Sequence, residues 1–269
     1  MVDAIITVFC ICDDYLKSID YKDDKQAAMS TSEILTTAII AAKFFGGSYA
    51  KSRWFLGSHN YVNHMLSESR FVRRLNQIDS EVLRGLFATM ASTFKAANKD
   101  NQYAIDSFPI PVCSNIRMYR CKIYRNKEYH GYCASKGEYF YGIRVHMLVT
   151  QYGEPVEFII EPGATSDIIV AQSFKFELPK GSKIHADKGY TDYGFEDHLE
   201  FSRQIHLLAS RKENAKRPDR GMCKKIRKRI ESSFSSIVGD FARKIHATTA
   251  FGFELKIALF IFAYSIKFM

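Results

Sequence analysis

Three carboxylates stand out because of where each falls relative to the apolar residues around it. Asp106 ends a short run of strand-forming residues that begins at Gln102, and Asp187 ends a second run that begins at Lys183. In a mixed sheet with helical crossovers, ligands gather at the carboxyl ends of the strands. We therefore expect the two aspartates to lie together at one edge of a sheet.

The third carboxylate, Glu231, lies in a strongly helical pattern. Between residues 224 and 241, apolar residues recur every three or four positions, at Ile226, Ile230, Phe234, Ile237 and Phe241. Glu231 is about 100° round the helix from Ile230, so it borders this apolar stripe. Arg227 lies one turn earlier on the same flank. The helix can therefore present a carboxylate past the edge of the sheet that it covers.

Clustered carboxylates repel one another unless cations neutralise them, and such hard oxygen ligands suit Mg²⁺ or Mn²⁺. Two such ions, about 3.5 to 4 Å apart, can activate a water or a 3′-hydroxyl and stabilise the leaving oxygen at phosphorus. Each carboxylate also has a structural interpretation: Asp106 as a turn residue, Asp187 as a loop cap and Glu231 as the partner of Arg227. Their joint occurrence in this order favours a site for two metal ions.

Positive charge is concentrated next to Glu231. The chain of 269 residues has 38 Lys and Arg against 29 Asp and Glu, a net charge of +9. Such an excess favours a polyanionic partner such as nucleic acid, although a charged run can also be a solvated surface. The candidate DNA-binding residues beside the carboxylates are Lys188, Arg211, Arg217, Lys224, Arg227 and Lys228.

Two other groups of cations could contact DNA. Arg73 and Arg74 lie on a predicted helix over residues 68–78, in a region whose short helices weakly resemble a helix-turn-helix arrangement. Between residues 117 and 132, arginines and lysines alternate with tyrosines. There we expect the cations to contact DNA and the aromatic rings to serve in packing.

The spacing of the cysteines argues against a structural zinc site, and the apolar runs argue against a membrane-spanning segment. None of the six cysteines forms a Cys-x-x-Cys pair, so a structural zinc site is not expected. The apolar run at residues 4–12 is too short for a bilayer, and charges interrupt the run at residues 251–268. We expect reduced thiols, a cytoplasmic protein and a C-terminal core helix that packs on a sheet.

The order of predicted elements indicates the fold class. Residues 1–100 are expected to form an all-α, DNA-binding domain with helices near 34–45, 49–56, 68–78 and 80–97. Residues 101–269 then give strands at 102–106, 140–152, 155–160, 183–187 and 204–209, with helices at 167–178, 192–201 and 224–241. This order predicts an α/β, ribonuclease-H-like catalytic domain, in which helices flank a mixed sheet.

Three blocks of residues resemble those of bacterial insertion-sequence transposases of the DDE type. They are Ile105-Asp-Ser-Phe-Pro-Ile110, His185-Ala-Asp-Lys-Gly-Tyr190 and Arg227-Lys-Arg-Ile-Glu-Ser-Ser-Phe234. The likeness covers most of residues 30–250 and is closest to a short-chain group with a helical N-terminal domain. Arg227 matches an arginine of the wider group, whereas Lys224 and Val238 replace its tyrosine and lysine. The two replacements change how phosphates and flanking bases would be held.

The resemblance implies a ribonuclease-H-like fold in which Asp106, Asp187 and Glu231 hold two Mg²⁺ ions. It also implies hydrolysis at element ends and attack of the freed 3′-hydroxyl on target DNA. The implied partner is double-stranded DNA, bound by a homodimer in the bacterial cytoplasm and nucleoid. Two other functions stay open: a nuclease of the same fold that does not join strands, and a DNA-binding regulator or inactive transposase remnant.

Overall fold

The structure is a computed structural model that describes residues 1–134, 136–211, 215–217, 224–241 and 245–269. Within residues 224–230, only Lys228 has a described side chain. The chain forms two compact units, one of residues 1–90 with 239–269 and one of residues 91–238. This division differs from the predicted domains, 1–100 and 101–269, because the C-terminal segment belongs to the helical unit.

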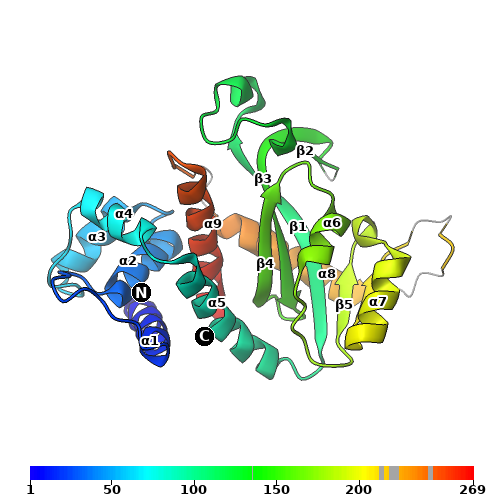
Figure 1. Cartoon of the computed structure of the whole chain (residues 1–269), viewed down its shortest axis with the longest axis horizontal. Helices are drawn as coiled ribbons and strands as arrows, with labels where there is room; N and C mark the ends of the chain where they lie inside the picture. The colour runs from blue at the N-terminus through cyan, green and yellow to red at the C-terminus, as the bar shows by residue number, and fades with distance from the viewer. Residues whose placement is uncertain (135, 212–214, 218–223, 242–244) are drawn as a thin grey trace. The chain divides into compact units, whose positions relative to one another are not determined.

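The first unit is built around α2 (Thr31–Phe44), which is buried along most of its length. Around α2 pack α1 (Val2–Ser18), α3 (Tyr49–Ser58), α4 (Glu68–Asn76) and α9 (Ala250–Ser265) (Figure 1). The start of α2 is set by a capping box, in which Ser30 accepts from the Glu33 amide and the Glu33 carboxylate accepts from the Ser30 amide at 2.7 Å. The helix therefore begins at Thr31, three residues before the predicted residue 34.

The C-terminal helix α9 packs on α2, whereas the sequence predicted that it would pack on a sheet. A helix that is largely apolar must be buried, but its sequence does not say against what. Here the Lys43 ammonium donates to the Ala263 carbonyl at 3.0 Å, and the rings of Phe87 and Phe262 meet edge to face at 5.8 Å. Among the described residues, no helix is both long and apolar enough to cross a membrane.

The second unit contains a mixed sheet, to which the end of α5 (Ser80–Ala97) leads. Its strands follow the order β2-β3-β1-β5-β6, and β4 also pairs with β3. β3 pairs antiparallel with both β1 and β4, and β5 and β6 run parallel to β1. This topology is ribonuclease-H-like, as predicted. The strand bounds are β1 (Gln102–Cys113), β2 (His130–Cys133), β3 (Glu138–Thr150), β4 (Pro155–Pro162), β5 (Lys183–Ala186) and β6 (His206–Ala209).

β1 continues past the residue at which the sequence predicted its end. It pairs with β3 from Tyr103 to Cys113 but with β5 only as far as Ile105. Beyond Ile105, one edge of β1 has no partner strand in the described sheet, so the missing N–H groups of Pro109 and Pro111 break no ladder on that side. The prolines therefore do not end the strand, and Asp106 lies within it.

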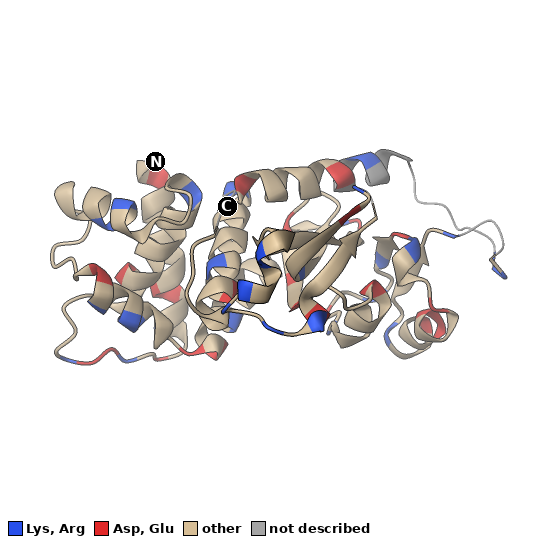
Figure 2. Ribbon diagram, turned by 90° about the horizontal axis from the view of Figure 1, so that it is seen from above, with Lys and Arg blue, Asp and Glu red and all other residues tan. Residues whose placement is uncertain are grey.

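Helices cover both faces of the sheet. α6 (Asp167–Ser173) and α8 (Lys224–Asp240) lie on opposite faces, and α7 (Tyr193–Arg203) connects β5 to β6 (Figures 1 and 2). The predicted apolar stripe of α8 is buried at Phe234 and Ile237. The ring of Phe234 meets that of Phe108 on β1, with centroids 6.2 Å apart. This contact holds α8 against the strand that carries Asp106.

Replacing Phe234 with alanine should destabilise the protein by about 3 to 5 kcal/mol, because the change leaves a cavity between α8 and β1. Phe201→Ala is the matched control, since Phe201 is 93% exposed and its removal should change stability by no more than about 0.5 kcal/mol. Chemical denaturation measures both. Equal effects of the two substitutions would show that α8 is not held by this contact.

Candidate functional site

The parallel register of two strands brings Asp106 and Asp187 together. Ala104 pairs with His185 and Ile105 with Ala186, so the next residues along the two strands are the two aspartates. Neighbouring strands lie about 4.8 Å apart. Asp187 is the N-cap of a short 3₁₀ turn over Lys188–Tyr190, and its side chain is exposed. The pair thus lies at the level of the sheet where β5 ends.

The surroundings of Asp106 make its ionised form unfavourable. Burial raises the pKa of Asp106 from its usual 3.8 to about 6, and the neighbouring charges of Asp187 and Asp167 raise it as well. The Ser107 amide, which donates to the Asp106 carboxylate at 2.8 Å, and the Arg144 guanidinium act in the opposite direction. A carboxyl group held beside two other acids is a suitable ligand for a divalent cation, which would favour the ionised form.

Asp167 is an acidic neighbour that the sequence analysis missed as a site residue. It lies in the first turn of α6, accepts a hydrogen bond from the Ser107 hydroxyl at 3.0 Å, and lies 3.6 Å from the Arg144 guanidinium. The direction of the strand before Asp167 could have identified this residue from the sequence. β4 is antiparallel to β3, which is antiparallel to β1, so β4 points the same way as β1 and the residues after it reach the same edge.

A cluster of polar side chains lies on the face of the sheet that carries Ser107. Ser107 faces His146 across the β1–β3 ladder, and Arg144 lies two residues from His146 on the same face. His146 is fully buried, and its Nδ1 lies 3.4 Å from the Tyr190 hydroxyl and 3.7 Å from Asp167. Burial and the nearby Arg144 lower the pKa of His146 to about 3, so the ring is neutral.

The opposite face of β1 carries Asp106 and Phe108, because side chains two residues apart on a strand share a face. α8 covers this face through Phe234, and Glu231 lies one helical turn before Phe234. Glu231 is exposed. Among the described residues, no three acidic, histidine or cysteine side chains are grouped closely enough to hold a metal ion. The structure therefore brings the two aspartates together and places the helix of Glu231 on the face of Asp106.

The predicted DNA-binding cations have different surroundings. Lys188, next to Asp187, and Lys228, one turn before Glu231 on α8, are both exposed, and basic residues mark the start of α8 in Figure 2. On α4, Arg73 is exposed, whereas Arg74 lies 3.1 Å from the Asp23 carboxylate. The side chains of Lys224 and Arg227 lie outside the described residues.

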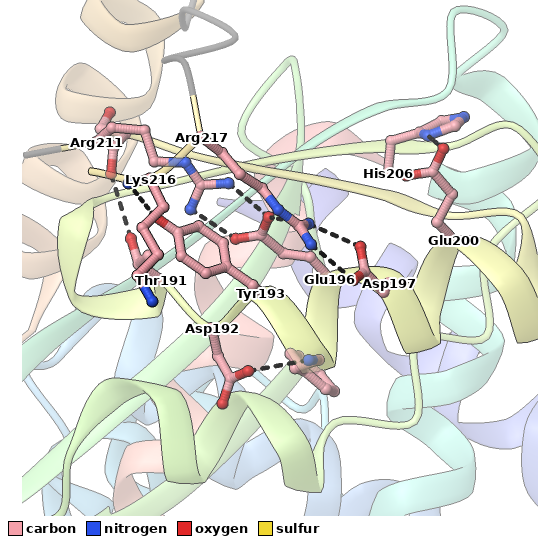
Figure 3. A network of polar contacts seen from close by, with 12 residues as sticks. Thr191, Asp192, Tyr193, Glu196, Asp197, Glu200, His206, Arg211, Lys216 and Arg217 are labelled. Carbon is pink, nitrogen blue, oxygen red and sulfur yellow. Dashed lines mark hydrogen bonds and ion pairs between the residues drawn. The ribbon is translucent and has the colours of Figure 1, made fainter.

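Arg211 and Arg217 are held by α7 (Figure 3). The Arg211 guanidinium is buried and donates to both oxygens of Glu196, at 2.7 and 2.5 Å. Arg217 is more exposed and forms a similar pair with Asp197, with both distances 2.7 Å. Both guanidinium groups lie over the Tyr193 ring. The expectation that Arg211 offers its charge to DNA needs correction, because a buried charge requires its partner and this one is bound to Glu196.

The pKa of Asp106 predicts how stability depends on pH in the absence of metal. Because the folded protein binds this proton more tightly than the unfolded chain does, stability should fall as pH rises from about 4 to above 6. For a shift in the pKa of Asp106 from 3.8 to about 6, the free energy of unfolding falls by about 3 kcal/mol over this range. Asp106→Asn should abolish the loss, whereas Asp100→Asn, at an exposed acid, should retain it. Urea denaturation in EDTA between pH 4 and 7.5 measures this, and parallel pH profiles for wild type and Asp106→Asn would contradict it.

Comparison with known proteins identifies the family. The family model described as transposase DDE domain matches residues 96–245, which contain all three blocks and the whole sheet. A piggyBac transposase, solved by cryo-electron microscopy in a synaptic complex with hairpin DNA, is similar with a TM-score of 0.46 and 10% identity, over 97% of this chain and 74% of that chain. No curated protein matches. Because the family match covers more than half of the chain, the protein belongs to the family of transposases with a DDE domain.

Proposed function

We propose that this protein is a DNA transposase that cleaves DNA at the ends of a mobile element and joins the freed 3′-hydroxyl to target DNA. The observation that carries the proposal is the β1–β5 register, which sets Asp106 beside Asp187 in a transposase DDE domain. We assign Glu231 as the third acidic residue of the site, since its helix covers the face of Asp106.

Asp106, Asp187 and Glu231 are proposed to hold Mg²⁺ or Mn²⁺, in a site for two ions. Bound divalent cations would supply activation of the attacking oxygen and stabilisation of the leaving oxygen. The donor set fits such ions, because carboxylate oxygens are their preferred ligands and because a cation would offset the unfavourable charge of Asp106. Asp187 is exposed, so a DNA backbone can approach this side of the pair.

The DNA contacts that we propose begin at the exposed cations beside the carboxylates. Lys188 follows Asp187 directly, and Lys228 lies one turn before Glu231, so both charges can reach phosphates at the reacting bond. We extend this role to Lys224 and Arg227 by their place on α8, and to Arg73 on α4. Because transposition holds two element ends together, the active form is proposed to be a homodimer on DNA, acting in the bacterial cytoplasm.

Asp187→Asn should abolish metal-dependent cleavage and strand transfer while leaving DNA binding largely intact, because it removes a metal ligand and no phosphate contact. Asp100→Asn is the matched control. Its carboxylate accepts from the Gln151 amide at 2.7 Å, and it precedes the start of β1. The control should retain both activities. The assay uses labelled element-end DNA with Mg²⁺, and cleavage by Asp187→Asn at the wild-type rate would contradict the assignment.

A pre-cut substrate with a free 3′-hydroxyl separates the open alternatives. Joining of this end to a target plasmid by the wild-type protein is expected of a transposase. Cleavage without joining would identify a nuclease of the same fold. DNA binding with neither reaction, at any Mg²⁺ or Mn²⁺ concentration, would identify a DNA-binding remnant.

A further inference from the structure

A strongly basic segment connects β1 to β2. We call residues 114–129 the β1–β2 insertion; it contains two short 3₁₀ turns, Asn115–Arg120 and Lys127–Tyr129. Its only acidic residue is Glu128. Five cations are all exposed: Arg117, Arg120, Lys122, Arg125 and Lys127. The insertion belongs to the same compact unit as the aspartate pair and extends beyond the sheet at the top of Figure 1.

The cations of the insertion differ from three arginines of this unit in lacking acidic partners. Arg144, Arg211 and Arg217 lie within 4.0 Å of carboxylates on α6 or α7. By contrast, none of the five insertion cations forms an ion pair with a carboxylate in the described part of the chain. Glu128, the acid nearest in sequence, accepts a hydrogen bond from the Asn126 side chain instead. Grouped like charges of this kind create a positive potential that a polyanion can neutralise.

The cations surround a hollow in the insertion. A cavity of about 690 Å³ is lined by Arg120, Lys122, Arg125, Lys127, His130 and Tyr141, among others. At its edge, the side chain of Tyr119 is 89% exposed. An exposed ring among cations can stack on a base while the cations contact phosphates. The chemistry of this surface therefore fits nucleic acid.

Contacts with the sheet hold the insertion in place. The Tyr141 hydroxyl donates to the Tyr124 carbonyl at 3.1 Å, and the Asn115 amide donates to the Tyr139 carbonyl at 2.6 Å. Tyr124 is buried and stacks on Tyr129 at 4.2 Å. Tyr124 and Tyr129 thus serve in packing, as the sequence predicted, whereas Tyr119 does not, and the cations lie on the surface of the insertion.

The insertion lies within reach of DNA that is bound at the aspartate pair. β1 runs for seven residues from Asp106 to Cys113, where the insertion begins, which is about 24 Å along the strand at ~3.4 Å per residue. That length corresponds to about seven base pairs of duplex at ~3.4 Å each. Arg144, which approaches Asp167 near the site, also donates to the Tyr132 carbonyl on β2 at 2.8 Å. The two regions are thus parts of one packed structure.

We propose that the β1–β2 insertion is a DNA-binding surface, whose cations contact the sugar-phosphate backbone about seven base pairs from the reacting bond. The inference rests on the proposed function, because it takes DNA as the polyanion. It adds a contact region that is separate from the basic residues beside Asp187 and Glu231.

The test removes two of the five charges, as Arg120→Gln with Arg125→Gln, in the full chain. The matched control is Arg84→Gln with Arg203→Gln, which removes the same charge from exposed arginines on α5 and α7. Binding of a 30-base-pair duplex is measured by fluorescence anisotropy in EDTA over a series of salt concentrations. Each lost phosphate contact lowers the slope of log K against log salt by about one. We therefore expect the slope to fall by about two and affinity to weaken at every salt concentration, with the control unchanged.

Denaturation curves of both double variants should match that of the wild type, since the altered side chains are exposed. An insertion variant with the wild-type slope and affinity would overturn the inference while leaving the catalytic proposal intact, because the cleavage assay of Asp187→Asn is independent of it. Wild-type protein that binds RNA or anionic lipid vesicles but not duplex DNA would overturn both.

Discussion

The parallel pairing of β1 with β5 is the constraint on which the rest of the site depends. This ladder ends at Ile105 and Ala186, so Asp106 and Asp187 follow side by side on neighbouring strands. Two carboxylates one strand spacing apart repel each other, and the partial burial of Asp106 adds to the unfavourable energy of its charge. The amide of Ser107 and the guanidinium of Arg144 offset part of that energy, and a bound cation would offset more.

Contacts on both faces of the sheet position this pair of aspartates. On one face, Ser107, Arg144, His146 and Asp167 form a polar group that connects β1 and β3 to α6. On the other face, the contact of Phe108 with Phe234 positions α8. Asp106 thus lies on a strand that is packed on both sides. Ligands on such rigid elements need little reorganisation when a metal or a DNA phosphate binds.

The sequence was sufficient where local patterns decide the structure. Helical periodicity placed α2 and α8, and the order of strands placed Asp106 next to Asp187. It was not sufficient where residues far apart in the sequence determine the structure. Whether Pro109 ends β1 depends on the length of β5, and the burial of Arg211 depends on Glu196 in a different element. The largely apolar helix α9 fits any core, so only the folded chain shows that it packs on α2.

Asp106, Asp187 and Glu231 are proposed to hold metal ions at one place. Iron-directed cleavage tests it directly: Fe²⁺ replaces Mg²⁺, and hydroxyl radicals formed with ascorbate and peroxide cut the backbone beside the metal. We expect cuts near all three residues, which lie on β1, directly after β5 and on α8, and we expect excess Mg²⁺ to suppress these cuts. Cuts near residues 106 and 187 alone would remove Glu231 from the site. Cuts at none of the three would contradict the metal site itself.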